Sequence, residues 1–302
     1  MASILPLEEN SWDVFQVGGE GLQFLSSQTG IYDADELKKH VQAVQAKAYQ
    51  IVAYPCIRTF DFTRFRMANL PAYSRVKTLL RERPDAILLD LGCCIGTDIR
   101  KAAADGFPVQ NFVACDLHPE FWNFGHELFR STPETFPVAF LAGDILDGGF
   151  LAPAVPQSTS TSTSPSPPLT TITSLTALTG HVSIVHVSYI FHQFDEQQQI
   201  DLARAIAGLL SPLPGSMTLG SQVGKRIMGY RPTPARYPGE QAQLFAHSPE
   251  SWTAMWEDLF PKGTVRVEAA LRKREECYPW ELLAPTPEGD DGILTWSITR
   301  LQ

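Results

Sequence analysis

The chain has 302 residues, of which 44% are hydrophobic, so it is long and apolar enough to bury one large core. Its formal net charge of −9, without any block of lysines and arginines, argues against a general nucleic-acid-binding protein. It carries no apolar run long enough to cross a membrane and no secretory signal at its start, and its five cysteines form no Cys-x-x-Cys pair, so we expect a reduced, cytoplasmic protein.

Residues 1–83 precede the regular pattern, and we expect them to form a helical lid. Acidic residues open a helix over 33–52, whose apolar side chains repeat every three or four positions until Pro55 stops it. The following stretch, YPCIRTFDFTRFRMANLPAY, is dense in aromatic residues and arginine. Two interpretations stay open for it: a packing layer over the edge of a sheet, or a lid over a cofactor or acceptor pocket.

From residue 84 to 302, short apolar runs alternate with helix-like segments, which predicts one α/β domain around a parallel sheet. The expected strands are 87–90, 112–115, 138–142, 182–187, 216–220, 264–271 and 293–301. The expected helices are 74–82, 97–104, 119–130, 195–210 and 249–260. No helix separates the last two strands, so we expect them to form an antiparallel closing pair.

The tract at 153–171 interrupts this pattern and consists mainly of proline, serine and threonine. Such a composition cannot bury enough apolar surface to offset the entropy lost on ordering. Because the alternation of strands and helices resumes directly after it, we expect a disordered surface insertion within the domain rather than a linker between domains.

The segment AILLDLGCCIG holds the centre of the predicted site. An apolar strand ends in Asp90, and a turn of small residues leads into a helix. The dinucleotide fingerprint Gly-x-Gly-x-x-Gly fits poorly, because Cys94 and Thr97 occupy its second and third glycine positions. The spacing of Asp90, Gly92 and Gly96 is instead similar to the first motif of class I S-adenosylmethionine (SAM)-dependent methyltransferases, which usually has a further glycine where Cys94 stands.

Polar residues at the ends of the next strands extend this site. Asp116 follows Gly96 by about 20 residues, the spacing at which a carboxylate accepts hydrogen bonds from two ribose hydroxyls. The methyltransferase resemblance implies that Asp144 reaches the adenine amino group and that Ile145 lies on the ring face. Ser188 ends the fourth strand, at the edge where open α/β sheets bind ligands. The predicted SAM-binding residues are Asp90, Gly92, Cys93, Gly96, Asp116, Leu117, Asp144, Ile145 and Ser188.

Six segments carry a narrower resemblance: DLGCCIG, CDLHPEFW, GDIL, SYIFHQFDEQQQ, GSQVG and FAHSPESWTAMW. Together they resemble a group of fungal methyltransferases of polyketide and meroterpenoid biosynthesis, over roughly residues 50–272. The resemblance implies a Rossmann-like, seven-stranded class I sheet with helices on both faces and its last strand antiparallel. It also implies methylation of a carboxylate on a farnesylated, aromatic-derived acid, or of an acidic hydroxyl on a related α-pyrone.

The acceptor decides which further residues the site needs. A carboxylate is already ionised at neutral pH and needs only donors that orient it, whereas a phenol or enol benefits from a general base. His192, just after the fourth strand, and His247 are the candidate catalytic residues, with a packed, hydrogen-bonded histidine as the alternative for each. Arg226, Tyr230 and Arg231 follow the fifth strand and are the candidate acceptor-binding residues, with a solvated loop as the alternative. We expect no metal site.

We therefore expect a SAM-dependent O-methyltransferase of fungal secondary metabolism that converts a terpenoid or polyketide carboxylate to a methyl ester. Methylation of an acidic phenol or α-pyrone enol is the alternative acceptor chemistry. A nicotinamide-dependent oxidoreductase and a non-catalytic, methyltransferase-like binding or regulatory protein are the interpretations from other classes. The expected partners are a small-molecule acid or hydroxyl acceptor and no nucleic acid, with a homodimer as one option.

Overall fold

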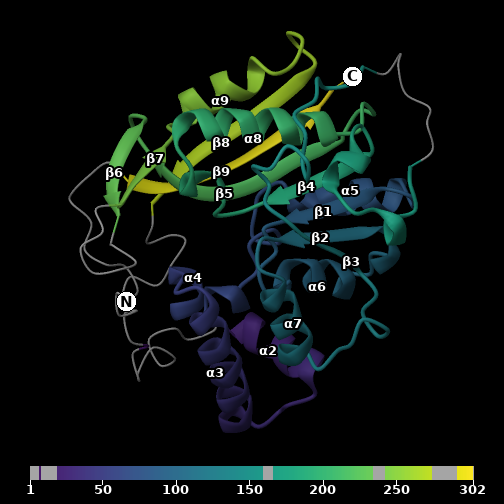
Figure 1. The fold of residues 1–302 in the computed structure, drawn as a ribbon, viewed down its shortest axis with the longest axis vertical. Helices are drawn as coiled ribbons and strands as arrows, with labels where there is room; N and C mark the ends of the chain where they lie inside the picture. Colours follow the sequence, from purple (N-terminus) through teal and green to yellow (C-terminus); the bar gives the residue numbers. More distant parts are fainter. Residues whose placement is uncertain (1–6, 8–18, 159–165, 234–241, 274–290, 302) are drawn as a thin grey trace.

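The computed structural model describes residues 7, 19–158, 166–233, 242–273 and 291–301. A sheet with helices on both faces forms the body of the molecule, and the N-terminal helices gather beside α7 at one end of it (Figure 1). Among these described residues, no helix is both long and apolar enough to span a membrane.

Seven strands form one mixed sheet in the order β3-β2-β1-β4-β5-β9-β8. Their bounds are β1 (Ile87–Leu91), β2 (Phe112–Asp116), β3 (Ala139–Ala142), β4 (Val182–Val187), β5 (Met217–Lys225), β8 (Val265–Arg272) and β9 (Asp291–Arg300). Strands β1 to β5 pair in parallel, and β9 is antiparallel to both of its neighbours. The predicted seven-stranded sheet with a reversed last strand is therefore confirmed, and the strand order changes direction between β1 and β4, where such sheets bind ligands.

The helices cover both faces of this sheet. Their bounds are α2 (Gly19–Thr29), α3 (Ala34–Ile51), α4 (Pro55–Arg58), α5 (Tyr73–Glu82), α6 (Thr97–Ala104), α7 (Pro119–Leu128), α8 (Glu196–Leu209) and α9 (Pro249–Glu257). Asp33, Asp195 and Ser248 begin α3, α8 and α9 by accepting a hydrogen bond from a backbone N–H of the first turn.

Alternate residues of β4 enter two different core layers, as the period of two in a strand requires. Val185 and Val187 pack with α8 and α9, while Ile184 packs with α5 and α6 on the other face. All six residues of β4 are buried, which is typical of a central parallel strand. His186 shares its face with Ile184, so its imidazole lies in the layer under α5 and α6.

A third core layer joins the N-terminal helices to α7. It combines Val41, Val44 and Ala48 of α3 with Phe121 and Leu128 of α7. At its rim the Nζ atom of Lys47 lies 2.6 Å from Glu127 Oε1. The N-terminal helices are thus packed against the domain, while the predicted domain boundary between residues 83 and 84 stays a prediction.

Three segments differ from the pattern expected from the sequence. The fifth strand continues to Lys225 rather than ending at 220, because its antiparallel pairing with β9 extends to Asp291. Beyond it, β6 (Gly229–Thr233) pairs with β7 (Ala242–Ala246) in a second, two-stranded sheet, although the sequence pattern predicted no strand in either segment. The expected helix at 33–52 is preceded by α2, which the sequence pattern did not predict.

The proline-, serine- and threonine-rich tract is described only in part, because residues 159–165 lie outside the described residues. Its first residues pack on the domain. A Cβ atom on Gly208 of α8 would lie 2.7 Å from Ala154 Cβ, and Arg300 Nη2 donates a hydrogen bond of 2.7 Å to the carbonyl of Gln157. The predicted disorder of the tract's centre stays a prediction.

Candidate active site

The turn after β1 has an unusual backbone at three positions. Gly92, Cys94 and Gly96 adopt φ angles of 74°, 50° and 75°, in the left-handed region. Glycine reaches this region freely, whereas a side chain such as that of Cys94 is strained there. The N–H groups of Gly92 and Cys93 both donate to the carbonyl of Cys115 at 2.9 Å, which folds the turn against the end of β2.

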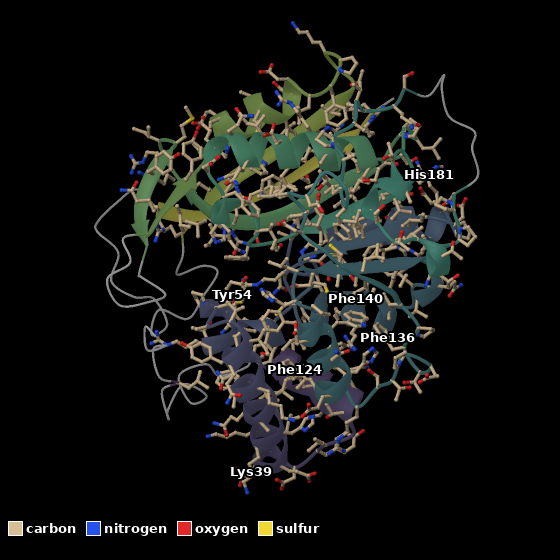
Figure 2. All side chains as sticks on the ribbon, viewed as in Figure 1. Lys39, Tyr54, Phe124, Phe136, Phe140 and His181 are labelled. Atoms are coloured by element: carbon tan, nitrogen blue, oxygen red, sulfur yellow. The ribbon has the colours of Figure 1, made fainter. Side chains whose placement is uncertain are left out.

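Gly92 and Gly96 are also required by internal packing. A Cβ atom on Gly92 would overlap the side chain of Ile190, and one on Gly96 would lie 2.7 Å from a ring atom of Trp122. Trp122 itself stacks on Phe140 of β3, with 5.1 Å between ring centroids. Phe140 is labelled in Figure 2. The sequence argument assigned these glycines to close approach of a ligand; the structure adds a packing reason, and their contact with SAM stays a prediction.

Asp116 ties the turn to the end of β2. Its Oδ2 accepts a hydrogen bond of 2.8 Å from Cys94 N, and its Oδ1 accepts one of 3.0 Å from His118 N. Burial raises the pKa of Asp116 above its ordinary value, although these two N–H donors oppose the shift. Each carboxylate oxygen can accept a second hydrogen bond, so the group retains capacity for ribose hydroxyls. Leu117 beside it is 54% exposed and offers apolar surface to an adenine ring.

Asp144 lies at the neighbouring strand end. The N–H of Gly143 donates to the carbonyl of Asp116 at 3.1 Å, which joins the ends of β2 and β3. The exposed carboxylate of Asp144 accepts from Leu146 N at 2.9 Å, and Ile145 between them is half-buried. The predicted adenine and ribose residues therefore occupy adjacent strand ends, as their proposed roles require.

A buried polar chain crosses the ends of β1, β4 and β5. His186 Nδ1 lies 2.7 Å from Asp90 Oδ1, and its Nε2 lies 2.9 Å from Ser188 Oγ, which also accepts a hydrogen bond of 3.2 Å from Ser221 N. Asp90 and His186 are 2% and 3% exposed. Burial alone would lower the pKa of His186, but the Asp90 carboxylate raises it above the ordinary histidine value.

Sequence reasoning missed His186 as a member of the site. This role could have been predicted from the sequence, because an ionisable side chain inside a buried strand needs a polar partner. Asp90 is such a residue in β1 and His186 is one in β4, and the two stand opposite each other in the strand register.

The pre-sheet segment, residues 54–73, closes over these strand ends from the face that carries α6. Asp98 Oδ1 accepts hydrogen bonds from Arg66 N at 2.8 Å and Met67 N at 2.7 Å. The Arg66 guanidinium pairs with Asp61 and lies 4.3 Å from the ring centroid of Tyr189.

Three aromatic side chains of the pre-sheet segment, Phe60, Phe62 and Phe65, are buried, as the packing-layer interpretation expects. Its further role as a lid over a bound molecule stays a prediction.

The two candidate bases lie in different surroundings. His192 is half-buried in a short helix (Phe191–Gln193), with its ring centroid 5.7 Å from that of Tyr189. His247 is 3% exposed, and its Nδ1 lies 2.9 Å from Ser251 Oγ. Burial lowers the pKa of His247 to about 4, so it is neutral at pH 7 and a weak proton acceptor. These contacts favour the packed interpretation of His247.

The candidate acceptor-binding residues gather beyond the end of β5. Arg226 is exposed in the turn before β6, Tyr230 is 54% exposed, and Arg231 is half-buried in β6. The ring of Tyr230 packs on Phe245 of β7 with 5.2 Å between centroids. Tyr230 and Arg231 therefore lie on the surface of a hairpin, and Arg226 lies in the turn that leads into it. Their contact with an acceptor stays a prediction.

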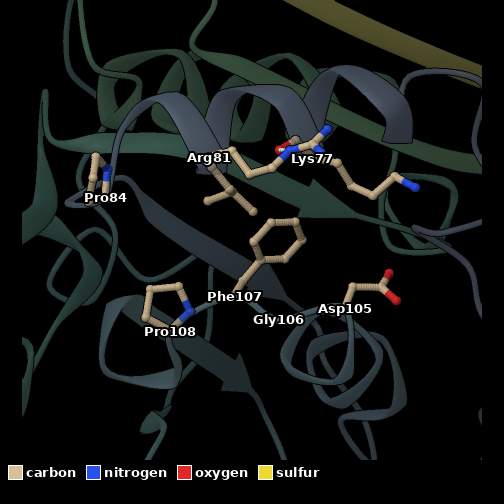
Figure 3. A pocket seen from close by; sticks show the side chains of 8 residues that line it. Lys77, Arg81, Pro84, Asp105, Gly106, Phe107 and Pro108 are labelled. Carbon is tan, nitrogen blue, oxygen red and sulfur yellow. Dashed lines mark hydrogen bonds between the residues drawn. The ribbon is translucent and has the colours of Figure 1, made fainter.

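One cavity of about 350 Å³ lies elsewhere on the domain (Figure 3). It is lined by residues of α5 and of the 105–108 connection, including Lys77, Arg81, Asp105 and Phe107. This connection leads into the amino end of β2, so the cavity lies at the sheet edge opposite to Asp116. In the part of the chain that the structure describes, no three histidine, cysteine or acidic side chains are grouped as metal ligands.

The strand order, the Asp-x-Gly-x-x-x-Gly turn and the acid at the end of β2 define a class I SAM-dependent methyltransferase. A family model described as the meroterpenoid methyltransferase N-terminal domain matches residues 12–63. The methyltransferase ausD of Penicillium brasilianum is 30% identical over 88% of this chain and 84% of its own length. The chain therefore belongs to the fungal meroterpenoid methyltransferase family, and SAM is its cofactor, as predicted.

The chain is also similar to other methyltransferases. The O-methyltransferase atr3 of Stereocaulon alpinum is 31% identical over 80% of this chain, which spans only 62% of the length of atr3. The Asnovolin E/Chermesin D methyltransferase nvfJ of Aspergillus novofumigatus is 29% identical over 88% of this chain and 83% of its own. A solved SAM-dependent methyltransferase from Mesorhizobium loti aligns with 78% of this chain and all of its own, at 14% identity and a TM-score of 0.44.

The left-handed conformation of Cys94 leads to a prediction about stability. Cys94→Gly should be about 1 kcal/mol more stable than Cys94→Ala, because both variants lose the thiol and only alanine keeps a Cβ atom in the strained conformation. Urea unfolding of the two variants measures the difference. The control pair is Cys93→Gly and Cys93→Ala, at a neighbour outside the left-handed region, where glycine should be the less stable. Equal stability of the two Cys94 variants would contradict the strain.

Asp98 leads to a prediction about pH. Burial raises its pKa to about 6, with the charge of His186 opposing the shift. The folded protein therefore binds more protons than the unfolded chain between about pH 4 and pH 6, and the contribution of Asp98 to stability falls as the pH rises through this window. Asp98→Asn cannot ionise. The difference in free energy of unfolding between this variant and the parent chain should therefore shift in favour of the variant by on the order of 1 kcal/mol from pH 5 to pH 7.5.

Urea unfolding at both pH values measures this gain, and Asp105→Asn is the matched control. Burial would raise the pKa of Asp105, but its hydrogen bond with Lys101 gives a net lowering. It is therefore already ionised at pH 5, and Asp105→Asn should show no comparable change in stability relative to the parent chain between pH 5 and pH 7.5. A gain for Asp98→Asn that does not change with pH would show that the carboxyl group does not titrate as assigned.

Proposed function

We propose that this methyltransferase transfers the methyl group of SAM to a carboxylate oxygen of a small terpenoid or polyketide acid. When bound, SAM supplies an electrophilic methyl group on a sulfonium with a good leaving group. The transfer is an in-line displacement, so the chain's own part is to bind and align the two reactants.

The surroundings of two histidines, His247 and His186, support a carboxylate acceptor, whereas His192 stays the candidate base that a phenol or enol acceptor would use. His247 is a weak base because burial lowers its pKa to about 4, and the raised pKa of His186 favours a proton donor over a proton acceptor. A carboxylate is ionised at neutral pH and needs no base, whereas a phenol must lose a proton during the reaction. The similarity to proteins named O-methyltransferase supports oxygen as the reacting atom.

The cofactor-binding roles proposed for individual residues follow their places at the strand ends. Asp116 would accept from the ribose hydroxyls, Asp144 from the adenine amino group, and Ile145 and Leu117 would contact the ring. The turn that holds Gly92, Cys93 and Gly96 would face the remainder of SAM.

A labelled-SAM assay tests the acceptor class. We expect label transfer to farnesoic acid or 2,4-dihydroxybenzoic acid, and we expect alkali to release the label because the product is a methyl ester. The comparison acceptor is 4-hydroxy-6-methyl-2-pyrone, which offers an acidic enol and would give a base-stable ether. Transfer to the pyrone alone, with base-stable label, would replace the carboxylate assignment by the enol alternative.

Isothermal titration with SAM tests the ribose assignment separately. Asp116→Ala should weaken SAM binding by tenfold or more, because a hydrogen bond to a charged group contributes about 1.5–3 kcal/mol. Asp147→Ala is the matched control, since this exposed acid follows the neighbouring strand β3 and its carboxylate accepts a local hydrogen bond from Gly149 N. A melting temperature for each variant separates lost binding from lost folding. Unchanged affinity in a folded Asp116→Ala variant would remove this residue from the SAM site.

A further inference from the structure

The hydrogen bonds of the buried chain fix where its protons lie. An ionised Asp90 can only accept, so His186 Nδ1, 2.7 Å from Asp90 Oδ1, carries a proton. The charged groups around this imidazole come from three elements: Asp90 on β1, Asp98 on α6 and Arg66 in the pre-sheet segment. Asp90 stands directly opposite His186 in the register and favours its charged form, in which Nε2 is protonated as well.

A charged His186 determines the direction of the Ser188 hydroxyl. Ser188 Oγ then accepts from His186 Nε2 at 2.9 Å and from Ser221 N at 3.2 Å. A hydroxyl oxygen accepts two hydrogen bonds, so both of its acceptor positions are occupied and its proton must be donated elsewhere. The Ser221 hydroxyl donates toward Ser188 Oγ over 3.4 Å, at the outer limit for a hydrogen bond, and so does not accept the Ser188 proton.

Ser188 lies at the edge of the sheet where this class of fold binds ligands. Ser188 is half-buried at the end of β4, beside the point where the strand order reverses. The next residue, Tyr189, has a φ of 60°, a strained conformation that turns the chain away from the strand axis, and its N–H donates to Ser221 O at 2.7 Å. The backbone is thus anchored on β5 while the Ser188 hydroxyl stays at the strand end.

We propose that Asp90 and His186 are positioning residues that turn the hydroxyl of Ser188 outward as a hydrogen-bond donor to the acceptor carboxylate. This proposal rests on the proposed function and assigns Ser188 to the acceptor rather than to SAM. A hydrogen bond from a neutral hydroxyl orients an anionic acceptor and leaves its charge on the carboxylate, which remains the nucleophile.

The arrangement has a defined response to pH. Above the pKa of His186, Nε2 loses its proton and becomes an acceptor, so the Ser188 hydroxyl turns toward it and no longer donates outward. Affinity for an acid acceptor should therefore fall as the pH rises through that pKa, which lies above the ordinary value of about 6.5. Arg66 and Asp98, which also face His186, keep their charges or gain one over this range and do not reverse the sign.

Nitrogen-15 spectra of the histidine side chains in the full chain test the first step without any acceptor. At about pH 6 we expect both ring nitrogens of His186 to be protonated, with the signal assigned by its loss in His186→Gln. Asp90→Asn should lower the pKa of His186, because it removes the opposing charge. A neutral His186 at this pH would overturn the proposal.

Kinetics with farnesoic acid or 2,4-dihydroxybenzoic acid, whichever the labelled-SAM assay shows to be methylated, test the second step. Ser188→Ala should raise KM for the acid about tenfold, leave the Kd for SAM within about twofold, and remove the alkaline loss of affinity. Ser188→Thr, which keeps a hydroxyl, should retain that pH profile. Ser183→Ala, a buried serine of the same strand away from its carboxyl end, is the matched control and should change none of these quantities.

The outcomes separate this proposal from the proposed function. An unchanged KM and pH profile in Ser188→Ala would overturn it, as would a weaker Kd for SAM with unchanged KM, because the hydroxyl would then serve the cofactor. If the parent chain binds SAM but methylates neither acid, the proposed carboxylate chemistry fails, and with it the assigned acceptor of Ser188. If the nitrogen-15 spectra then show a doubly protonated His186, the Ser188 hydroxyl still points away from His186, and only the identity of the group that it binds is wrong.

Discussion

The contact between Asp90 and His186 is the constraint on which the site depends. Each residue is the ionisable member of a buried central strand, and an ionised group buried there without its partner costs several kcal/mol. The pair therefore specifies the register between β1 and β4, since a slip of one residue would turn each side chain to the opposite face of the sheet. Fixing that register also fixes the relative positions of the turn after β1 and the end of β4, the two elements between which the class binds its ligands.

The same buried cluster joins the N-terminal part of the chain to the site. Asp98 faces Asp90 and His186 on one side and binds the backbone of Arg66 and Met67 on the other. The Arg66 guanidinium in turn lies over Tyr189, next to Ser188. The pre-sheet segment is therefore held across the strand ends by polar contacts as well as by its buried aromatic rings. A change in the charge of His186 would alter the electrostatic interactions both at the end of β4 and in the pre-sheet segment, because charged groups of both lie close to its imidazole.

The sequence predicted the sheet and the cofactor motif because both depend on local patterns. Apolar runs ending in a polar residue mark parallel strands, and the spacing from Gly96 to Asp116 spans one helix and one strand. The role of His186 could not be read in this way, because it arises from the register between strands that lie far apart in the chain. The hairpin of β6 and β7 was missed for another reason: β6 reads Gly-Tyr-Arg-Pro-Thr, and a glycine and a proline within so short a run argue against a strand.

Cys94 shows how a departure from a sequence pattern can be weighed physically. Glycine at this position would remove the strain of a left-handed side chain, about 1–2 kcal/mol, and would keep the N–H that binds Asp116. What glycine cannot supply is the thiol contact to Cys56 of α4, which also lowers the pKa of Cys56. A hydrogen bond between thiols is weak, so folding stability alone favours glycine. Cysteine therefore acts through position rather than stability. Its thiol joins α4, the first helix of the pre-sheet segment, to the turn that this class uses for its cofactor. Asp116 binds the same turn through the N–H of Cys94.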